Sequence, residues 1–244
     1  MLRRLTEHLR RQDWLAVILE LVVVVVGIFL AFQVDRWYEE QRIKSDLQAH
    51  LASLTEDFAE NETRLTSAIS TGRQEMEAAV TLRAELLKDN PDLSVAELNQ
   101  LLSQLSSLPT FQAVDLAYRN LINAGILAAL PNSDLKKELA EFYAAHELTK
   151  LIQNTQELQF VTIWQPYALN NLDYAASNSK QGLKRNDAAL RPYVDPDLVL
   201  EAMKTKQFEN IIVMHWETAE DLVNNWSGLL DRVKRIQVML ASFN

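Results

Sequence analysis

The sequence predicts an all-α protein, in which an N-terminal transmembrane helix continues into an elongated antiparallel helical bundle. The 244 residues include only five glycines and six prolines, which is few for β architecture, because hairpins and sandwiches consume turn residues. One long apolar run lies near the N-terminus, and beyond it apolar residues recur at helical spacing. We therefore expect a cytoplasmic segment over residues 1–13, a membrane anchor over 14–34 and an extracytoplasmic helical bundle domain over 35–244.

The anchor has the length and composition of a membrane span. Residues 14–34 make a helix about 31 Å long, which matches a hydrocarbon core about 30 Å thick. Fifteen of these residues are Leu, Ile, Val or Phe, and together they favour insertion by about 4 to 9 kcal/mol. Glu20 opposes insertion by at most about 3.5 kcal/mol. Insertion is therefore favoured despite the carboxylate.

A cleaved signal peptide is the alternative interpretation of this run. A signal peptide would have a shorter apolar core, followed by a cleavage site of small residues. The stretch "FLAFQVDRW" contains no such site, so we expect the anchor to stay uncleaved.

The residues that flank the span predict its orientation. Aromatic side chains collect at membrane interfaces, and basic residues collect on the cytoplasmic side. We therefore expect a bacterial inner-membrane protein whose N-terminus is cytoplasmic and whose C-terminal domain is periplasmic. The expected interface anchors are Arg3, Arg4, Arg10, Arg11, Trp14, Trp37 and Tyr38.

One face of the span carries small and polar residues. Ala16, Glu20, Gly27 and Ala31 fall close to one side of a helix, because they are separated by offsets of 4, 7 and 4 residues. Small residues allow a second helix to approach, and a polar group in lipid gains from a partner. The face is therefore a candidate docking surface. Alternatively, Glu20 is protonated and its side chain reaches toward the cytoplasmic interface.

Beyond the membrane, the first helix is predicted to continue to about Leu87. Its apolar stripe has an average spacing near 3.67 residues, whereas a left-handed coiled coil needs 3.5. The stripe also passes through Asn61, Gly72 and Arg83, which are poor residues for a coiled-coil seam. We therefore expect this helix to pack on later helices of its own chain.

Turn and capping residues divide the rest of the chain. Pro91 ends the first helix, and Ser94 caps a second helix that runs to about Ser107. A third helix is expected over 111–124, ending at Gly125. Asn132 or Ser133 then caps a long helix.

The long helix is expected to run through Trp164, with a kink at Pro166, to about Ala176. A polar surface loop over residues 177–197 follows it. Pro196 begins the last helix, which is expected to extend to Phe243.

The search for catalytic or metal-binding motifs is mostly negative. No P-loop, nucleophile elbow, dinucleotide fingerprint or His-Glu-x-x-His motif occurs, and no glutamate stands three residues before a histidine. We expect His146 and His215 to be solvated surface residues that bind metal only with help from elsewhere in the fold. We expect the aromatic residues of the later helices to form core, although a ligand site between helices is an open alternative; they are Trp164, Tyr167, Tyr174, Trp216 and Trp226.

Charge and composition exclude several classes of protein. From Asp35 onward the chain has 20 basic and 30 acidic residues, which argues against a nucleic-acid partner. The chain has no cysteine, so disulfides, thiolate metal sites and cysteine nucleophiles are excluded.

Two stretches carry a resemblance to a known family. "DWLAVILELVVVVVGIFLAFQVDRWYEEQR" and "YRNLINAGILAALPNSDLKKELAEFY" are similar to the anchor and the turn signature of a bacterial family of single-pass membrane proteins with a domain of unknown function. Arg36 and Tyr38 depart from the Asn expected at these positions. The resemblance implies the architecture and the location, and it implies no activity, cofactor or catalytic residue.

The leading functional hypothesis is therefore a non-enzymatic, membrane-anchored accessory or scaffolding subunit of a cell-envelope complex. Its expected partners are the lipid bilayer and another membrane protein or further copies of itself. No cofactor, metal or catalytic residue is expected. The alternative hypotheses are an extracytoplasmic bundle that senses a ligand and signals through a partner membrane protein, and, third, an enzyme.

Overall fold

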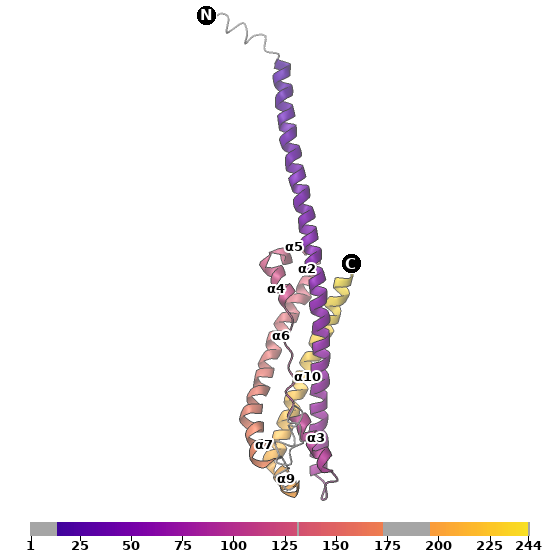
Figure 1. Ribbon diagram of the computed structural model, residues 1–244, viewed down its shortest axis with the longest axis vertical. Coiled ribbons are helices and arrows are strands. Elements are labelled where there is room, and N and C mark those ends of the chain that lie inside the picture. Colours follow the sequence, from indigo (N-terminus) through magenta and orange to yellow (C-terminus); the bar gives the residue numbers. More distant parts are fainter. Residues whose placement is uncertain (1–13, 131, 173–195, 244) are drawn as a thin grey trace, which may run out of the picture. The chain divides into compact units, whose positions relative to one another are not determined.

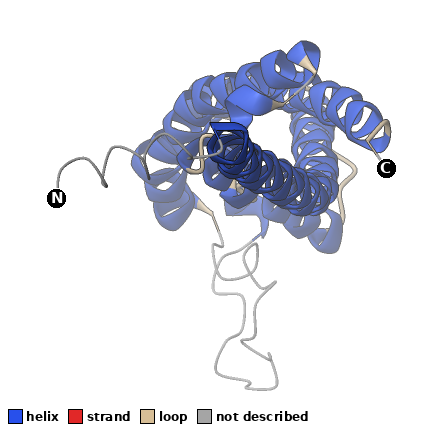
Figure 2. Cartoon of the chain, turned by 90° about the horizontal axis from the view of Figure 1, so that it is seen from above, coloured by secondary structure: helices blue, strands red, loops and turns tan. Residues whose placement is uncertain are grey.

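The computed structural model describes residues 14–130, 132–172 and 196–243. It is 86% helical, and the described residues contain no strand, which confirms the all-α prediction (Figure 2). The chain divides into two compact units, Met1–Ala52 and Ser53–Asn244.

The first unit contains the N-terminal part of helix α2, which spans Trp14–Leu86. This is a helix long and apolar enough to cross a membrane, and none of the side chains in its apolar window is buried. Exposed fractions of 48 to 64% for the large apolar residues between Ile18 and Val34 show that this stretch has no apolar cover within the described part of the chain. The end of α2 at Leu86 agrees with the predicted end near Leu87.

The second unit contains the rest of α2 and all later elements. Three long helices, α2, α6 and α10, lie side by side in this unit, and shorter helices pack at their ends (Figure 1). The later elements are α3 (Val95–Leu105), α4 (Leu116–Asn123), α5 (Ile126–Ala129), α6 (Ser133–Gln159), the π-helical turn η1 (Phe160–Trp164), α7 (Gln165–Asn171), α9 (Pro196–Met203) and α10 (Lys206–Ala241).

Two helix starts follow directly from capping side chains. The Ser94 Oγ accepts the Glu97 N–H, and the Glu97 carboxylate accepts the Ser94 N–H at 2.9 Å, which forms a capping box before α3. The Asn132 Oδ1 accepts the N–H groups of Asp134 and Leu135 and so begins α6. Both predicted caps are confirmed.

The directions of the long helices depend on an extended segment between α3 and α4. Helix α10 runs antiparallel to α2 and α6, as expected, whereas α2 and α6 run parallel to each other (Figure 1). Residues 107–115, between the end of α3 and the start of α4, contain no helix and lead the chain back along α2. The predicted helix over 111–124 is therefore wrong for its first turn, and α4 begins only at Leu116.

The predicted kink at Pro166 takes the form of the π-helical turn η1. Proline has no N–H to donate, and its ring clashes with the carbonyl four residues earlier. The chain widens one turn before Pro166, where the Gln165 N–H donates to the Phe160 carbonyl. The last predicted helix is also interrupted, because the Thr205 Oγ1 accepts the Phe208 N–H and starts α10 separately from α9.

The core of the second unit lies between α2, α6 and α10. It includes two fully enclosed tryptophans, Trp164 and Trp226, and four buried phenylalanines. A distal cluster joins the end of α2 to α3, α7, α9 and the start of α10. The expectation that α2 packs on its own chain is confirmed for this unit, since Leu54, Leu65 and Leu82 are completely buried.

The turn between α4 and α5 depends on one glycine. Gly125 has φ 70°, a left-handed conformation that costs a residue with a Cβ about 1–2 kcal/mol. We expect Gly125→Ala to destabilise the second unit by about 1 kcal/mol in denaturant unfolding of the full chain in detergent. Gly228→Ala is the matched control, because Gly228 lies inside α10 in open space and should become more stable by up to about 1 kcal/mol. A loss of stability at both positions would contradict the explanation.

Candidate functional site

The predicted docking face is exposed on α2. Glu20, Gly27 and Ala31 are all exposed, and a Cβ added to Gly27 would meet no atom within 4 Å. Their separations of 7 and 4 residues keep them on one side of the helix. Trp14 and Ala16 belong to the first turn of α2, and their side chains lie outside the described part of the structure. The described face is open to another helix.

The predicted interface anchors are only partly within the described residues. Trp37 and Tyr38 are exposed by 55% and 63%, and their ring centroids lie 5.1 Å apart in an edge-on contact. Such a paired aromatic surface suits the headgroup region of a bilayer. The four arginines of the N-terminal segment, Arg3, Arg4, Arg10 and Arg11, lie outside the described residues.

Polar side chains of α2 hold the extended segment between α3 and α4 in place. Asn61 is fully buried; its Oδ1 accepts the Val114 N–H at 2.7 Å, and its Nδ2 donates to the Val114 carbonyl at 3.0 Å. Asp57 accepts the Ala117 N–H at 2.8 Å. Each bond satisfies a backbone group that no strand or helix would otherwise pair. The position of Asn61 in the apolar stripe of α2 is thus explained by its hydrogen bonds to the backbone of Val114.

We expect Asn61→Ala to lower the free energy of unfolding by about 1–3 kcal/mol, because it removes the acceptor of the Val114 N–H and leaves that group without a hydrogen bond. The Val114 carbonyl keeps a second donor, the Tyr143 hydroxyl at 3.1 Å. Chemical denaturation of the full chain in detergent would measure the loss. Thr63→Ala is the matched control, because the Thr63 hydroxyl donates only to the carbonyl of Ala59 within the same helix; an equal loss there would contradict the assignment.

A second buried polar cluster joins all three long helices. Glu75 of α2 is completely buried, and its Oε1 lies 3.2 Å from the Nδ1 of His215 on α10. The Gln156 amide of α6 lies 3.5 Å from the other Glu75 oxygen. His215 and Gln156 are exposed by 5% and 3%. We call these three residues the Glu75 cluster.

The electrostatics of the Glu75 cluster are dominated by the burial of its polar groups. Burial raises the pKa of Glu75 above its ordinary value of 4.5, and the hydrogen bond and charge of His215 oppose that rise. The Nε2 atom of His215 and the Oε1 atom of Gln156 are buried without a hydrogen-bond partner among the described residues. The cluster is therefore only partly satisfied, a condition that makes a buried polar network costly and sensitive to protonation.

The second buried histidine has a structural role. The Nε2 of His146 accepts the Ala113 N–H at 3.4 Å, and its ring lies edge-on to Phe111. Burial lowers the pKa of His146. The expectation that His146 and His215 are solvated surface residues is wrong, because both are buried by chain segments distant in sequence. No group of three His, Cys, Asp or Glu side chains that could hold a metal occurs among the described residues.

The predicted aromatic core is largely as expected. Trp164, Tyr167 and Trp226 are buried, and Trp216 is partly buried against the distal cluster. The Trp226 Nε1–H donates to the Gln153 side-chain oxygen at 3.0 Å, which also accepts the Phe111 N–H at 3.1 Å. Tyr174 lies outside the described residues.

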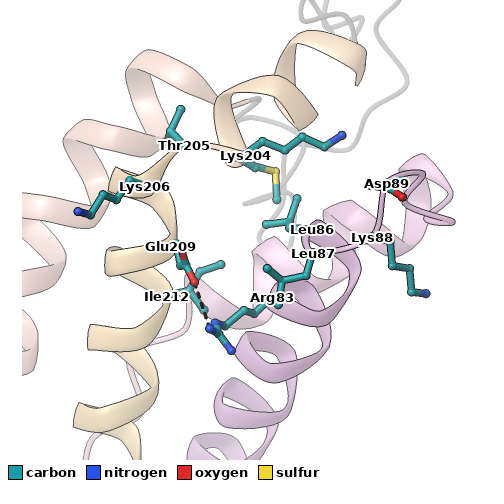
Figure 3. A pocket seen from close by; sticks show the side chains of 11 residues that line it. Arg83, Leu86, Leu87, Lys88, Asp89, Lys204, Thr205, Lys206, Glu209 and Ile212 are labelled. Atoms are coloured by element: carbon teal, nitrogen blue, oxygen red, sulfur yellow. Dashed lines mark hydrogen bonds and ion pairs between the residues drawn. The ribbon is translucent and has the colours of Figure 1, made fainter.

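A cleft of about 660 Å³ lies between the end of α2 and the α9–α10 junction (Figure 3). Its apolar lining includes Leu86, Met203 and Ile212. Arg83 and Glu209 form an ion pair of 3.1 Å within the lining (Figure 3). The lining carries more basic than acidic side chains, and its charged members are Arg83, Lys88, Lys204, Lys206, Asp89 and Glu209.

This cleft has the size of a small-molecule site and a mixed lining. Figure 3 shows Lys88 and Lys206 on opposite sides of the cleft, so their charges do not converge on one point. Sequence reasoning did not find the cleft, because its lining comes from segments more than 100 residues apart.

Comparisons of the chain with protein-family models, with curated proteins and with solved structures give no match.

Proposed function

We propose that this chain is a non-enzymatic, single-pass membrane protein that serves as an accessory or scaffolding subunit of a cell-envelope complex. In this proposal α2 anchors the chain in a bacterial inner membrane, with the N-terminus in the cytoplasm and the second unit in the periplasm. The anchor docks through its Glu20, Gly27 and Ala31 face on a transmembrane helix of another protein or of a second copy.

The observation that carries the proposal is the exposure of this face inside the apolar stretch of α2. Glu20 and Gly27 are exposed, and no described residue of the chain covers them. A carboxyl group in lipid is costly without a partner. Gly27 lies two turns after Glu20, and Ala31 lies one turn after Gly27; both are small and permit close approach of a helix. A docked helix would give the carboxyl group a polar partner and would cover the small residues.

Two further features support the location. Four arginines precede the span within its first flanking segment, whereas three basic residues, Arg36, Arg42 and Lys44, closely follow it. This excess agrees with a cytoplasmic N-terminus. The resemblance to single-pass proteins of unknown function suggests the same architecture. A reporter fused after Asn244 tests the orientation, since it should be active only in the periplasm.

The docking test is affinity purification of the full chain from native membranes, after crosslinking, with partners identified by mass spectrometry. Gly27→Leu fills the docking face and Glu20→Leu removes its polar group, and we expect each to lose the partner. Val25→Leu is the matched control, because Val25 lies about 200° around the helix from Gly27. Unchanged partners in both face variants would refute docking.

A second candidate function is ligand sensing by the bundle, with signalling through a partner helix. The cleft lined by Arg83, Leu86 and Lys204 favours it, since its lining combines apolar side chains with basic ones. A thermal-shift screen of small anionic amphiphiles against the full chain in a non-ionic detergent tests it, because a bound ligand stabilises by mass action. Arg83→Gln should abolish a true shift, and a shift that persists in this variant would reject the site.

A further inference from the structure

We propose that Glu75 and His215 form a pH-responsive lock, which holds α2, α6 and α10 together while the pair keeps its shared proton and releases them when that proton is lost. The lock goes beyond the scaffolding role, and it does not depend on the membrane partner.

The geometry places a titratable pair at a point where all three long helices meet. The contact of 3.2 Å joins residues 140 positions apart, so it forms only when α2 and α10 are packed. Gln156 adds α6 to the same point through the Glu75 carboxyl. The ring of Trp164 lies 5.2 Å from that of His215 in an edge-on contact and closes the cluster from η1. The cluster is therefore a contact that opening of the bundle must break.

His215 is the charged or titratable group that faces Glu75 within the described residues. The α6 and η1 side chains at the cluster, Gln156 and Trp164, carry no charge. The α3 residues that enter the adjoining core are leucines. The nearby charged residues are exposed to solvent; they are Arg73 and Glu77 of α2, Glu157 of α6 and Glu217 of α10. Among the described residues, no other charge is therefore in place to compensate the pair.

The pair is electrically neutral when it holds one shared proton, on either the carboxyl group or the imidazole. Loss of that proton leaves a buried carboxylate beside a neutral imidazole. A buried charge without compensation is costly, and separation of the helices hydrates it. The unpartnered Nε2 of His215 shows that no second donor or acceptor is present among the described residues to absorb the change.

The direction of the pH dependence follows from Glu75. Its pKa is raised in the closed bundle and returns toward 4.5 when the cluster opens. The open form also exposes an imidazole, and a hydrated imidazole keeps its own proton up to about pH 6.5. The closed and open forms therefore bind the same number of protons between pH 4.5 and that pH. Above it the closed pair alone keeps its shared proton, and this advantage is lost as the pH rises through the raised pKa. Over that interval the opening equilibrium constant should rise by up to about tenfold per pH unit, the limit for one linked proton.

The test is hydrogen–deuterium exchange of the full chain in nanodiscs between pH 5 and pH 8, with the intrinsic pH dependence of exchange removed. We expect the opening constants of peptides that contain Glu75, Gln156 and His215 to rise with pH. In Glu75→Gln the cluster keeps a neutral side chain of the same shape and has no shared proton to lose, so these constants should no longer rise with pH. Glu77→Gln, the matched exposed change two residues away, should keep the wild-type slope.

His215→Leu gives a second, independent outcome. It removes the two effects that lower the pKa of Glu75, so the rise in the opening constant should continue to a higher pH than in the wild type. A wild-type opening constant independent of pH would overturn the lock. So would a slope that persists unchanged in Glu75→Gln, or a rise in His215→Leu that ends at the wild-type pH.

Discussion

The His215→Leu variant is expected to lose about 3 kcal/mol of unfolding free energy at pH 7 and less than about 1 kcal/mol at pH 5. Leucine is similar in size to histidine, so the change removes the partner of Glu75 without leaving a large cavity. The completely buried carboxyl must then stay protonated. In the unfolded wild type a hydrated imidazole can hold the proton up to about pH 6.5, whereas in the unfolded variant no such group is left. Each pH unit between 4.5 and that pH therefore adds up to about 1.4 kcal/mol to the loss. Denaturant unfolding of the full chain in detergent at both pH values measures the difference.

The double variant His215→Leu with Glu75→Gln provides the control for this prediction. It contains no titratable group in the cluster, so the cluster should add no pH dependence to its unfolding free energy between pH 5 and pH 7. The coupling energy from the full mutant cycle isolates the Glu75–His215 interaction. Equal losses at both pH values in the His215→Leu single variant would mean that packing, rather than charge, dominates at this position.

The Trp226→Ala variant is expected to lose about 3–5 kcal/mol, the largest packing effect in the second unit. Trp226 has no exposed surface and lies against Gly72 of α2, where an added Cβ would already come within 3.5 Å of the indole ring. Its indole N–H also donates to the side-chain oxygen of Gln153, and the same oxygen accepts a hydrogen bond from the Phe111 N–H. Removing the ring therefore empties the core between α2 and α10 and frees the side chain that links α6 to the extended segment.

Two substitutions separate the packing term from the hydrogen bond. Trp226→Phe retains most of the ring and loses the indole N–H, so we expect a loss nearer 1 kcal/mol, since Gln153 keeps its bond from Phe111. Trp216→Ala removes a tryptophan that is only partly buried, and its loss should be smaller than that of Trp226→Ala. Similar midpoints for Trp216→Ala and Trp226→Ala in the same denaturant titration would contradict the assignment of Trp226 as the central core residue.

The sequence predicted the helices and several of their ends because these depend on local chemistry. Ser94 and Asn132 offer side-chain acceptors to the first N–H groups of α3 and α6, and Gly125 adopts the left-handed turn that ends α4. Pro166 and Pro196 affect their helices through the missing N–H and the fixed ring, both of which are local properties. These residues act within one or two turns, so their signals can be read without the fold.

The local pattern failed where a distant segment decided the conformation. Residues 111–115 have a composition compatible with a helix, but Asn61, Gln153 and Tyr143 offer their backbone groups better partners. This extended segment makes α2 and α6 parallel. The start of α10 at Thr205 was missed as well, although a threonine cap is a local signal, because no proline or glycine marks the break.

Composition and spacing by themselves determined the helical class, the apolar span that carries Glu20, Gly27 and Ala31, and the caps of α3 and α6. Only the tertiary structure decided that Glu75, Gln156 and His215 meet, that His146 is buried, and that a cleft opens beside Arg83. The physical reason is that burial of a polar group is favourable only with a partner. Here the partners lie 33 to 140 residues apart along the chain, a distance over which helical periodicity carries no information.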